Sequence, residues 1–213
     1  MSAGIAARTV VFDFGGVLFR WEPAALLRGV LPHLASSHDE ALRLSQQIFE
    51  SFRPGSDWSE FDRGRVSEET LVARIAQRTG LAARDVAAVV EAVPGHLEPQ
   101  APTVQLLHRL HGAGLRLCYL SNMPAPYAAH LEATHAFMRL FDDGVFSARV
   151  GHVKPEPRIF EAAERALRLD PAQTVFIDDV QHNADQAREH GWSAIHFIGA
   201  QDCERQLRTL GWL

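Results

Sequence analysis

The chain has few cysteines, no excess of basic residues and no long apolar run. Only Cys118 and Cys203 occur among its 213 residues, which excludes a disulfide framework and favours a reducing compartment. The formal net charge is -5 and lysine and arginine form no run, so we expect no nucleic-acid partner. No apolar run approaches the roughly 20 residues of a membrane helix, and Met1 to Arg8 lack the apolar stretch of a signal peptide. We therefore expect a cytoplasmic protein with no membrane partner.

The chain does have an ordinary globular composition and an alternation of strand and helix patterns. It is 46% hydrophobic and 22% charged, and it is long enough to bury a large core. Short apolar runs predict strands over residues 9–13, 115–120, 141–147, 174–177 and 193–198. Helical patterns separate the later strands. This alternation predicts a parallel sheet with right-handed crossovers.

The segment between the first two strands carries helical patterns and no convincing strand. It is too long for a crossover, so it predicts an inserted helical cap over residues 20–96. The fold class is then α/β, with a Rossmann-like parallel sheet core formed by residues 1–19 and 97–213. Within the cap, Trp58 to Arg65 is predicted as a loop with a polar tip at Asp62-Arg63-Gly64, and Pro94-Gly95 as the end of a helix that begins at Ala83.

Three of the predicted strands end in polar residues, which a parallel sheet brings to one edge. These are Asp13, then Ser121-Asn122, then Asp178-Asp179. Each has a simpler explanation by itself, as a turn or a helix N-terminus, and Lys154 is explained equally well as a surface lysine. Turns and helix N-termini do not explain all of these residues at one edge, because clustered carboxylates repel unless a cation or a proton lies among them. Mg²⁺ fits such oxygen ligands, and Ser, Asn and Lys beside it suit a phosphate.

These segments resemble the motifs of the haloacid dehalogenase-like hydrolases, most of which are phosphatases. The resemblance covers essentially the whole chain, and the four motifs occur in the family's order. They are Val11 to Leu18, Leu120 to Asn122, Lys154 to Phe160, and Phe176 to Asp179 followed by Asn183 and Gly191. The segment from Glu60 to Ser67 is similar to a cap segment of the branch that includes sugar-1-phosphate phosphatases and the phosphatase domain of soluble epoxide hydrolases.

The resemblance implies Mg²⁺-dependent hydrolysis of a small phosphorylated metabolite, such as a sugar phosphate, through an aspartyl-phosphate. Asp13 would be the nucleophile, and Lys154 would neutralise Asp13 and the phosphate together. Ser121 and Asn122 would bind the phosphate. The implied metal site consists of Asp13, the backbone carbonyl of Gly15 and Asp179. Asp178 would be an alternative ligand or would support the ligands from behind. Asn183 would hold Lys154 or the metal ligands in place.

Gly15 departs from the family pattern. Most phosphatases of the family carry a second Asp at this position, which protonates the leaving group and later activates water. A glycine transfers no proton, and such help is typically worth roughly 10²- to 10⁴-fold in rate. Either the enzyme is slow, or it prefers good leaving groups, or a cap His or Asp supplies the proton. His182 beside the acidic pair is a further candidate donor, and Trp21 and Trp58 are candidates for substrate contact.

Two other functions stay open. The first is a 2-haloacid dehalogenase of the same family, which also lacks the second Asp but needs no metal and lacks the acidic pair at residues 178–179. The second is a non-catalytic binding module that keeps the fold, since fold does not imply function. The oligomeric state is open as well.

Overall fold

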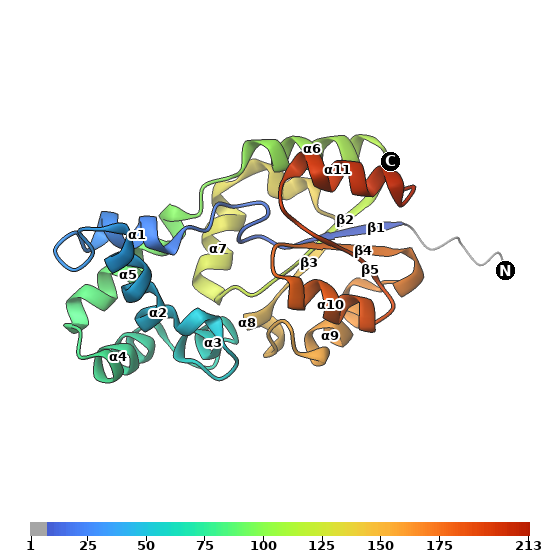
Figure 1. The fold of residues 1–213 in the computed structure, drawn as a ribbon. Coiled ribbons are helices and arrows are strands. Elements are labelled where there is room, and N and C mark those ends of the chain that lie inside the picture. The colour runs from blue at the N-terminus through green and yellow to red at the C-terminus, as the bar shows by residue number, and fades with distance from the viewer. Residues whose placement is uncertain (1–7) are drawn as a thin grey trace.

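A computed structural model describes residues 8–213, so the expectations for the first seven residues lie outside the described part. The centre is a five-stranded parallel sheet with the order β3-β2-β1-β4-β5 (Figure 1). The strands are β1 (Thr9–Phe12), β2 (Arg116–Ser121), β3 (Asp143–Phe146), β4 (Thr174–Asp178) and β5 (Ser193–His196). The predicted α/β fold with a parallel sheet is therefore confirmed.

Helices cover both faces of the sheet, which explains why every residue of β1 and β4 is buried. Figure 1 shows α6 and α11 on one face and α8, α9 and α10 on the other. Their bounds are α6 (Ala101–Gly112), α8 (Ser147–Val150), α9 (Pro157–Leu167), α10 (Gln181–Glu189) and α11 (Ala200–Thr209), while α7 (Ala125–Thr134) follows β2. Short 3₁₀ turns occupy η2 (Ala136–Leu140) and η3 (Pro171–Gln173). Among residues 8–213, none of the helices combines the length and apolarity needed to cross a membrane.

Five of the six α-helices between β1 and β2 lie together beyond the carboxyl ends of the strands (Figure 1). They are α1 (Pro23–Val30), α2 (His38–Phe49), α3 (Asp57–Asp62), α4 (Glu68–Thr79) and α5 (Ala83–His96), with the 3₁₀ turn η1 (Glu50–Phe52) after α2. We call these helices the cap. The predicted division at residues 19/20 and 96/97 stays a prediction.

Two predictions for the cap were wrong. Residues 58–65 were expected to be a loop, but α3 occupies Asp57–Asp62, with the Ser56 side chain accepting a hydrogen bond from the Ser59 N–H at its start. Six residues are too few to show a helical period, and buried packing of Trp58 and Phe61 stabilises this helix. The helix expected to end before Pro94 continues to His96.

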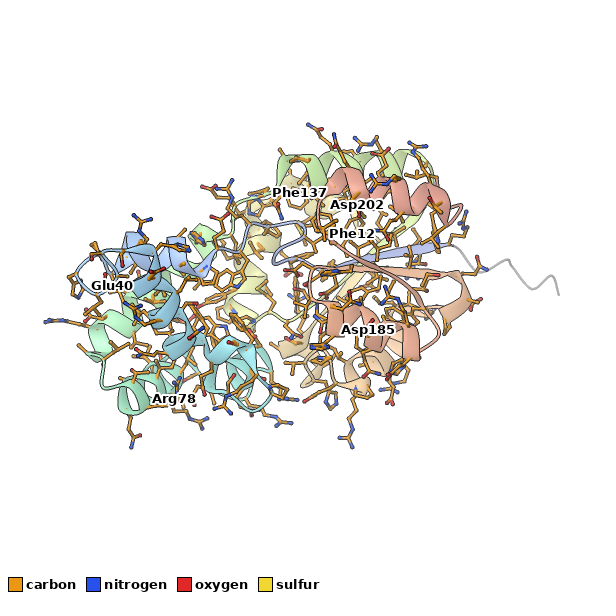
Figure 2. The ribbon with its side chains drawn as sticks, in the orientation of Figure 1. Phe12, Glu40, Arg78, Phe137, Asp185 and Asp202 are labelled. Atoms are coloured by element: carbon orange, nitrogen blue, oxygen red, sulfur yellow. The ribbon has the colours of Figure 1, made fainter. Side chains whose placement is uncertain are left out.

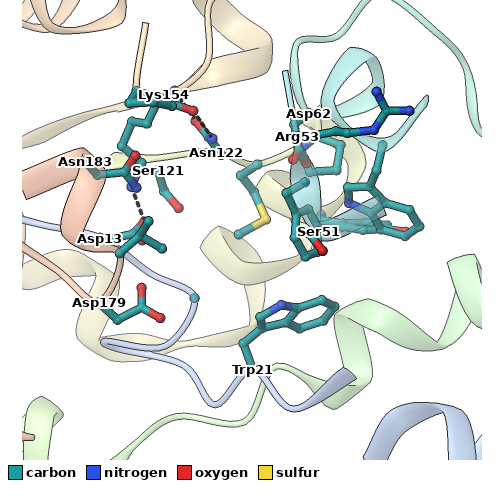
Figure 3. Close-up of a pocket in the computed structure, with 18 of the residues that line it drawn as sticks. Asp13, Trp21, Ser51, Arg53, Asp62, Ser121, Asn122, Lys154, Asp179 and Asn183 are labelled. Carbon is teal, nitrogen blue, oxygen red and sulfur yellow. Dashed lines mark hydrogen bonds and ion pairs between the residues drawn. The ribbon is translucent and has the colours of Figure 1, made fainter. Parts of the chain in front are cut away.

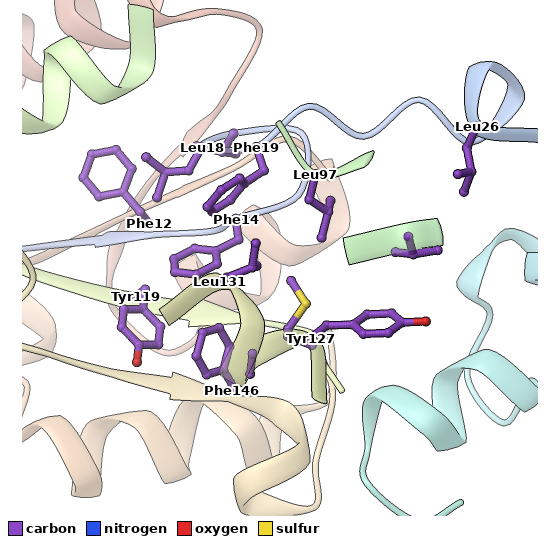
Figure 4. Close-up of a cluster of buried hydrophobic side chains, with 14 of the residues drawn as sticks. Phe12, Phe14, Leu18, Phe19, Leu26, Leu97, Tyr119, Tyr127, Leu131 and Phe146 are labelled. Atoms are coloured by element: carbon purple, nitrogen blue, oxygen red, sulfur yellow. The ribbon is translucent and has the colours of Figure 1, made fainter. Parts of the chain in front are cut away.

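An aromatic cluster anchors the turn that follows β1. The Phe14 ring lies 5.0 Å from Tyr119, 5.2 Å from Phe146 and 5.4 Å from Phe19 between ring centroids (Figure 4). The Phe14 carbonyl also accepts hydrogen bonds from the N–H groups of three following residues, 17 to 19. Such packing fixes the backbone at Asp13, the residue just before the cluster. Charged side chains such as Arg78 and Asp185 lie on the outer surface, while Phe12 is fully buried (Figure 2).

Candidate active site

The predicted strand-end residues meet around one cavity of about 370 Å³ between the sheet edge and the cap. Asp13, Gly15, Ser121, Asn122, Lys154, Asp179 and Asn183 all line it. Figure 3 shows Asp13, Ser121, Lys154 and Asp179 on one side of this cavity and residues of the cap on the other. The parallel sheet accounts for the convergence, because Asp13, Ser121 and Asp178 each come at the carboxyl end of a strand.

Lys154 joins two carboxylates in the interior. Its Nζ lies 2.8 Å from Asp13 Oδ1 and 2.6 Å from Asp178 Oδ2, and only 5% of the residue is exposed. Its backbone is held by Asn122, whose side-chain amide donates to the Lys154 carbonyl at 3.0 Å and accepts from the Lys154 N–H at 2.8 Å. The side chain of Asn122 thus positions Lys154, and its predicted contact with phosphate stays a prediction.

The two neighbouring aspartates have different surroundings. Asp178 is fully buried, and its two oxygens accept hydrogen bonds from Lys154 Nζ, the Asn183 side chain and the Val180 N–H. Asp179 is the more exposed, and among residues 8–213 no other side chain hydrogen-bonds its carboxylate. The lone pairs of Asp178 are therefore largely used within the protein, while those of Asp179 face the cavity.

Oxygen atoms of Asp13, Asp178 and Asp179 all lie within 4.8 Å of one another. Burial, reinforced by Asp178 and Asp179 and opposed by Lys154, raises the pKa of Asp13 to about 7. Burial and the charge of Asp178 raise the pKa of Asp179 to about 6. Burial lowers the pKa of Lys154, but Asp13 and Asp178 outweigh it, so that pKa is raised and the ammonium stays charged. A cation among the carboxylates would favour their ionised forms and lower their pKa values.

The two glycines after Asp13 differ in the space around them. Gly16 has φ +75°, and a Cβ built there would lie 2.1 Å from Asp179 Oδ2. At Gly15 the nearest atom to such a Cβ is Trp21 Cβ at 3.9 Å, and φ is not in the left-handed region. A Cβ therefore fits at position 15 and not at position 16.

Matched alanine variants are expected to separate these two positions. Gly15→Ala should change the free energy of unfolding by less than about 0.5 kcal/mol, whereas Gly16→Ala should lower it by at least about 1–2 kcal/mol because of its left-handed backbone. Gly16→Ala should also weaken metal binding, because Asp179 must move aside. Urea unfolding and Mg²⁺ titration of both variants test this. Equal stability of the two proteins would contradict it.

The cap supplies the opposite wall of the cavity. Trp58 and Asp62 come from α3, and Trp21 comes from the segment before α1, so both tryptophans named as candidates line the cavity. His182 lines it as well, from the first turn of α10. Asp62 is a cap aspartate on the cavity wall, the kind of residue expected as an alternative proton donor, but the loop prediction gave no reason for its burial. The cap contacts the core through Arg63, whose guanidinium bonds both oxygens of Glu156 at 2.7 and 2.5 Å.

Comparison with known proteins gives one family match and several similar chains. A family model described as haloacid dehalogenase-like hydrolase matches residues 7–191. Sesquiterpene phosphatase astK of Aspergillus oryzae is 28% identical over 95% of this chain and 96% of its own length. Drimenol cyclase drtB of Aspergillus calidoustus is 25% identical over 95% of this chain but only 36% of its own length. A HAD family enzyme of Bacteroides thetaiotaomicron, solved with magnesium and inorganic phosphate, has a TM-score of 0.67 at 21% identity and covers 89% of this chain and 93% of its own.

Proposed function

The chain belongs to the haloacid dehalogenase-like hydrolases, and on that premise we propose that it is a Mg²⁺-dependent phosphomonoester hydrolase. The observation that carries the proposal is the buried Asp13 carboxylate, which pairs with Lys154 beside Asp179 on the cavity wall. A relative named as a phosphatase matches over nearly its full length, and a neighbour of the same fold holds magnesium and inorganic phosphate. Both support phosphate-ester chemistry.

The donor set suits a small hard cation. Asp13 and Asp179 offer carboxylate oxygens to the cavity, and Gly15 lines it with its backbone. We propose these three as the residues that hold Mg²⁺, with Asp178 behind them as the partner of Lys154 and Asn183 as the partner of Asp178. When bound, Mg²⁺ would orient the phosphate and offset its negative charge.

The chemistry of the protein groups follows from their positions. An oxygen of Asp13 attacks phosphorus and forms an aspartyl-phosphate, while the bond from phosphorus to the organic oxygen breaks. Lys154 offsets the charge that accumulates around Asp13, and Ser121, a buried residue on the same wall, donates to a phosphoryl oxygen. Water then attacks the aspartyl-phosphate and releases inorganic phosphate.

The cavity wall beyond these residues is mostly apolar, and this bears on the organic part of the substrate. The apolar side chains are those of Trp21, Phe52, Trp58, Val93, Leu97, Met123, Pro124, Tyr127 and Val180. The polar side chains on this part of the wall are Ser51, Arg53, Asp62 and His182. A sugar hydroxyl placed against the apolar side chains would lose water without gaining a hydrogen-bond partner, which is costly. The sugar-phosphate prediction remains untested, and this wall favours a phosphate ester of an apolar alcohol. The names of two relatives, which refer to a sesquiterpene and to drimenol, are in keeping with such a substrate.

The test is phosphate release by the purified protein from a prenyl monophosphate, glucose 1-phosphate and p-nitrophenyl phosphate. We expect release in Mg²⁺ that EDTA abolishes and added Mg²⁺ restores. The kcat/KM of the prenyl ester should exceed that of the sugar ester by at least about 10-fold, since apolar contacts discriminate on this scale. Chloride release from 2-chloropropionate without phosphate release would favour the dehalogenase, and no release from any substrate would favour a binding module.

A further inference from the structure

The carboxyl group of Asp62 is buried, faces the cavity and has no partner. Asp62 is the last residue of α3, only 6% of it is exposed, and it lines the same cavity as Asp13. Within residues 8–213, no group donates a hydrogen bond to its carboxyl or forms an ion pair with it. Figure 3 shows Asp62 across the cavity from Asp13 and Asp179. Within residues 8–213, Ser59 Oγ is the only fully buried side-chain polar atom without a partner, so the Asp62 oxygens are reached from the cavity and are free to bond a substrate group there.

The backbone of Asp62 is firmly attached to the core. Ser147 Oγ donates a hydrogen bond to the Asp62 carbonyl and accepts one from the Met123 N–H at 2.8 Å. The next residue, Arg63, bonds Glu156. The backbone of Asp62 is therefore fixed beside the segment after β2 that carries Asn122 and Met123. A catalytic group needs such support from its neighbours.

Burial favours the protonated form of Asp62. Burial raises its pKa to about 8, Lys154 lowers it and Asp13 raises it. Tyr127 on α7 also interacts with Asp62, and its own pKa is raised, first by burial. An acid in this state carries a proton near neutral pH and can donate it.

The other proton-bearing groups of the cavity are less suited to protonate a leaving group. The Tyr127 hydroxyl donates to the Val90 carbonyl at 2.7 Å, so its proton is in use. Lys154 is held between two carboxylates. His182 is exposed and lies on the same wall as Asp179, next to the proposed metal site.

We propose that Asp62 is the acid and base that replaces the aspartate missing at position 15, an inference that rests on the proposed hydrolase function. When the phosphorus–oxygen bond to the organic group breaks, its electron pair stays on the leaving oxygen. That oxygen takes the proton of Asp62 and departs as an alcohol. The Asp62 carboxylate then takes a proton from water as the water attacks the aspartyl-phosphate. The products are inorganic phosphate, free Asp13 and protonated Asp62, which completes the cycle.

The test compares Asp62→Asn with the unmodified protein on an alkyl and an aryl phosphate. We expect kcat/KM for the prenyl ester to fall by about 10²- to 10⁴-fold, and that for p-nitrophenyl phosphate by less than about 10-fold, because p-nitrophenolate leaves without a proton. The alkaline limb of the pH profile for the prenyl ester should disappear in the variant. Asp57→Asn is the matched control on the same helix, since Asp57 is paired with Arg78 and does not line the cavity.

A further variant distinguishes proton transfer from a structural role. Gly15→Asp added to Asp62→Asn should recover part of the alkyl-ester activity, since a Cβ at position 15 meets no atom closer than 3.9 Å. The assignment of Asp62 would be overturned if kcat/KM of Asp62→Asn fell equally for both esters or for neither. It would also be overturned if Gly15→Asp recovered no activity in the double variant. A leaving-group-selective loss in His182→Gln in place of Asp62→Asn would do the same. If the unmodified protein releases no phosphate from either ester, the hydrolase proposal itself fails.

Discussion

Asp13→Asn is expected to lower Mg²⁺-dependent phosphate release on the order of 10⁴-fold or more, as removal of a nucleophile does elsewhere. An amide does not attack phosphorus, and the substitution also removes one negative charge from the proposed metal site. The substitution keeps the shape of the side chain, and the Asp13 N–H keeps its bond to the Ile177 carbonyl at 2.9 Å. Lys154 keeps Asp178 as a partner. The activity should therefore be lost at the reaction step and not through unfolding. Single-turnover release of phosphate measures that step.

The thermal stability of Asp13→Asn gives a second check, because it should stay the same or rise while the activity falls. The folded-state pKa of Asp13 is about 7, above its value of 3.8 in an unfolded chain, so ionised Asp13 costs stability. That cost begins as the pH rises above the unfolded value and is complete above pH 7. In EDTA at pH 8, Asp13→Asn should therefore unfold at the same temperature as the unmodified protein or a higher one. Asp185→Asn on the exposed face of α10 is the control. Persistent release by purified Asp13→Asn would remove Asp13 as nucleophile.

Lys154→Met is expected to affect both folding and activity. It leaves Asp13 and Asp178 close together with no buried positive charge between them. Removing one partner of a buried ion pair typically costs about 3–5 kcal/mol of unfolding free energy, which urea denaturation in EDTA measures. Phosphate release should be lost as well, because no ammonium remains to offset the charge at phosphorus.

A double variant separates these two effects. Adding Asp178→Asn to Lys154→Met removes the second uncompensated carboxylate, so most of the lost stability should return. Activity should not return, because the ammonium beside Asp13 is still missing. Recovery of both properties would mean that Lys154 acts only in folding. Unchanged stability of Lys154→Met would contradict the buried network.

The sheet and the convergence of its strand ends follow from local sequence patterns, because apolar runs and their polar ends are visible without tertiary contacts. The parallel arrangement then places Asp13, Ser121 and Asp178 at one edge whatever the details of packing. No local sequence pattern predicts that Lys154 lies in the site. Its position depends on the loop before α9 and on its bonds to Asn122, and only the family resemblance indicated it.

The helix α3 and the environment of Asp62 depend on contacts between distant segments. Packing of Trp58 against Phe49 and of Phe61 against Tyr127, with ring centroids 4.6 and 5.5 Å apart, stabilises a helix too short to be visible as a pattern. The difference between Asp178 and Asp179 is likewise set by neighbours from other elements. For this reason the sequence alone did not decide between Asp178 and Asp179 as the metal ligand.

The apolar wall has a consequence for the order in which products leave. Trp21, Phe52 and Trp58 belong to the cap side of the cavity, and Met123 and Tyr127 to the core side, so an organic group in it touches both. Lys154 and Ser121, the two groups proposed to bind phosphate, both belong to the core side. In the proposed mechanism, the alcohol therefore has to give up contacts with both cap and core as it leaves, whereas phosphate contacts the core alone. The hydrolysing water in that mechanism takes the place of the alcohol only after the alcohol has left, so we expect the alcohol to be the first product released and phosphate the second.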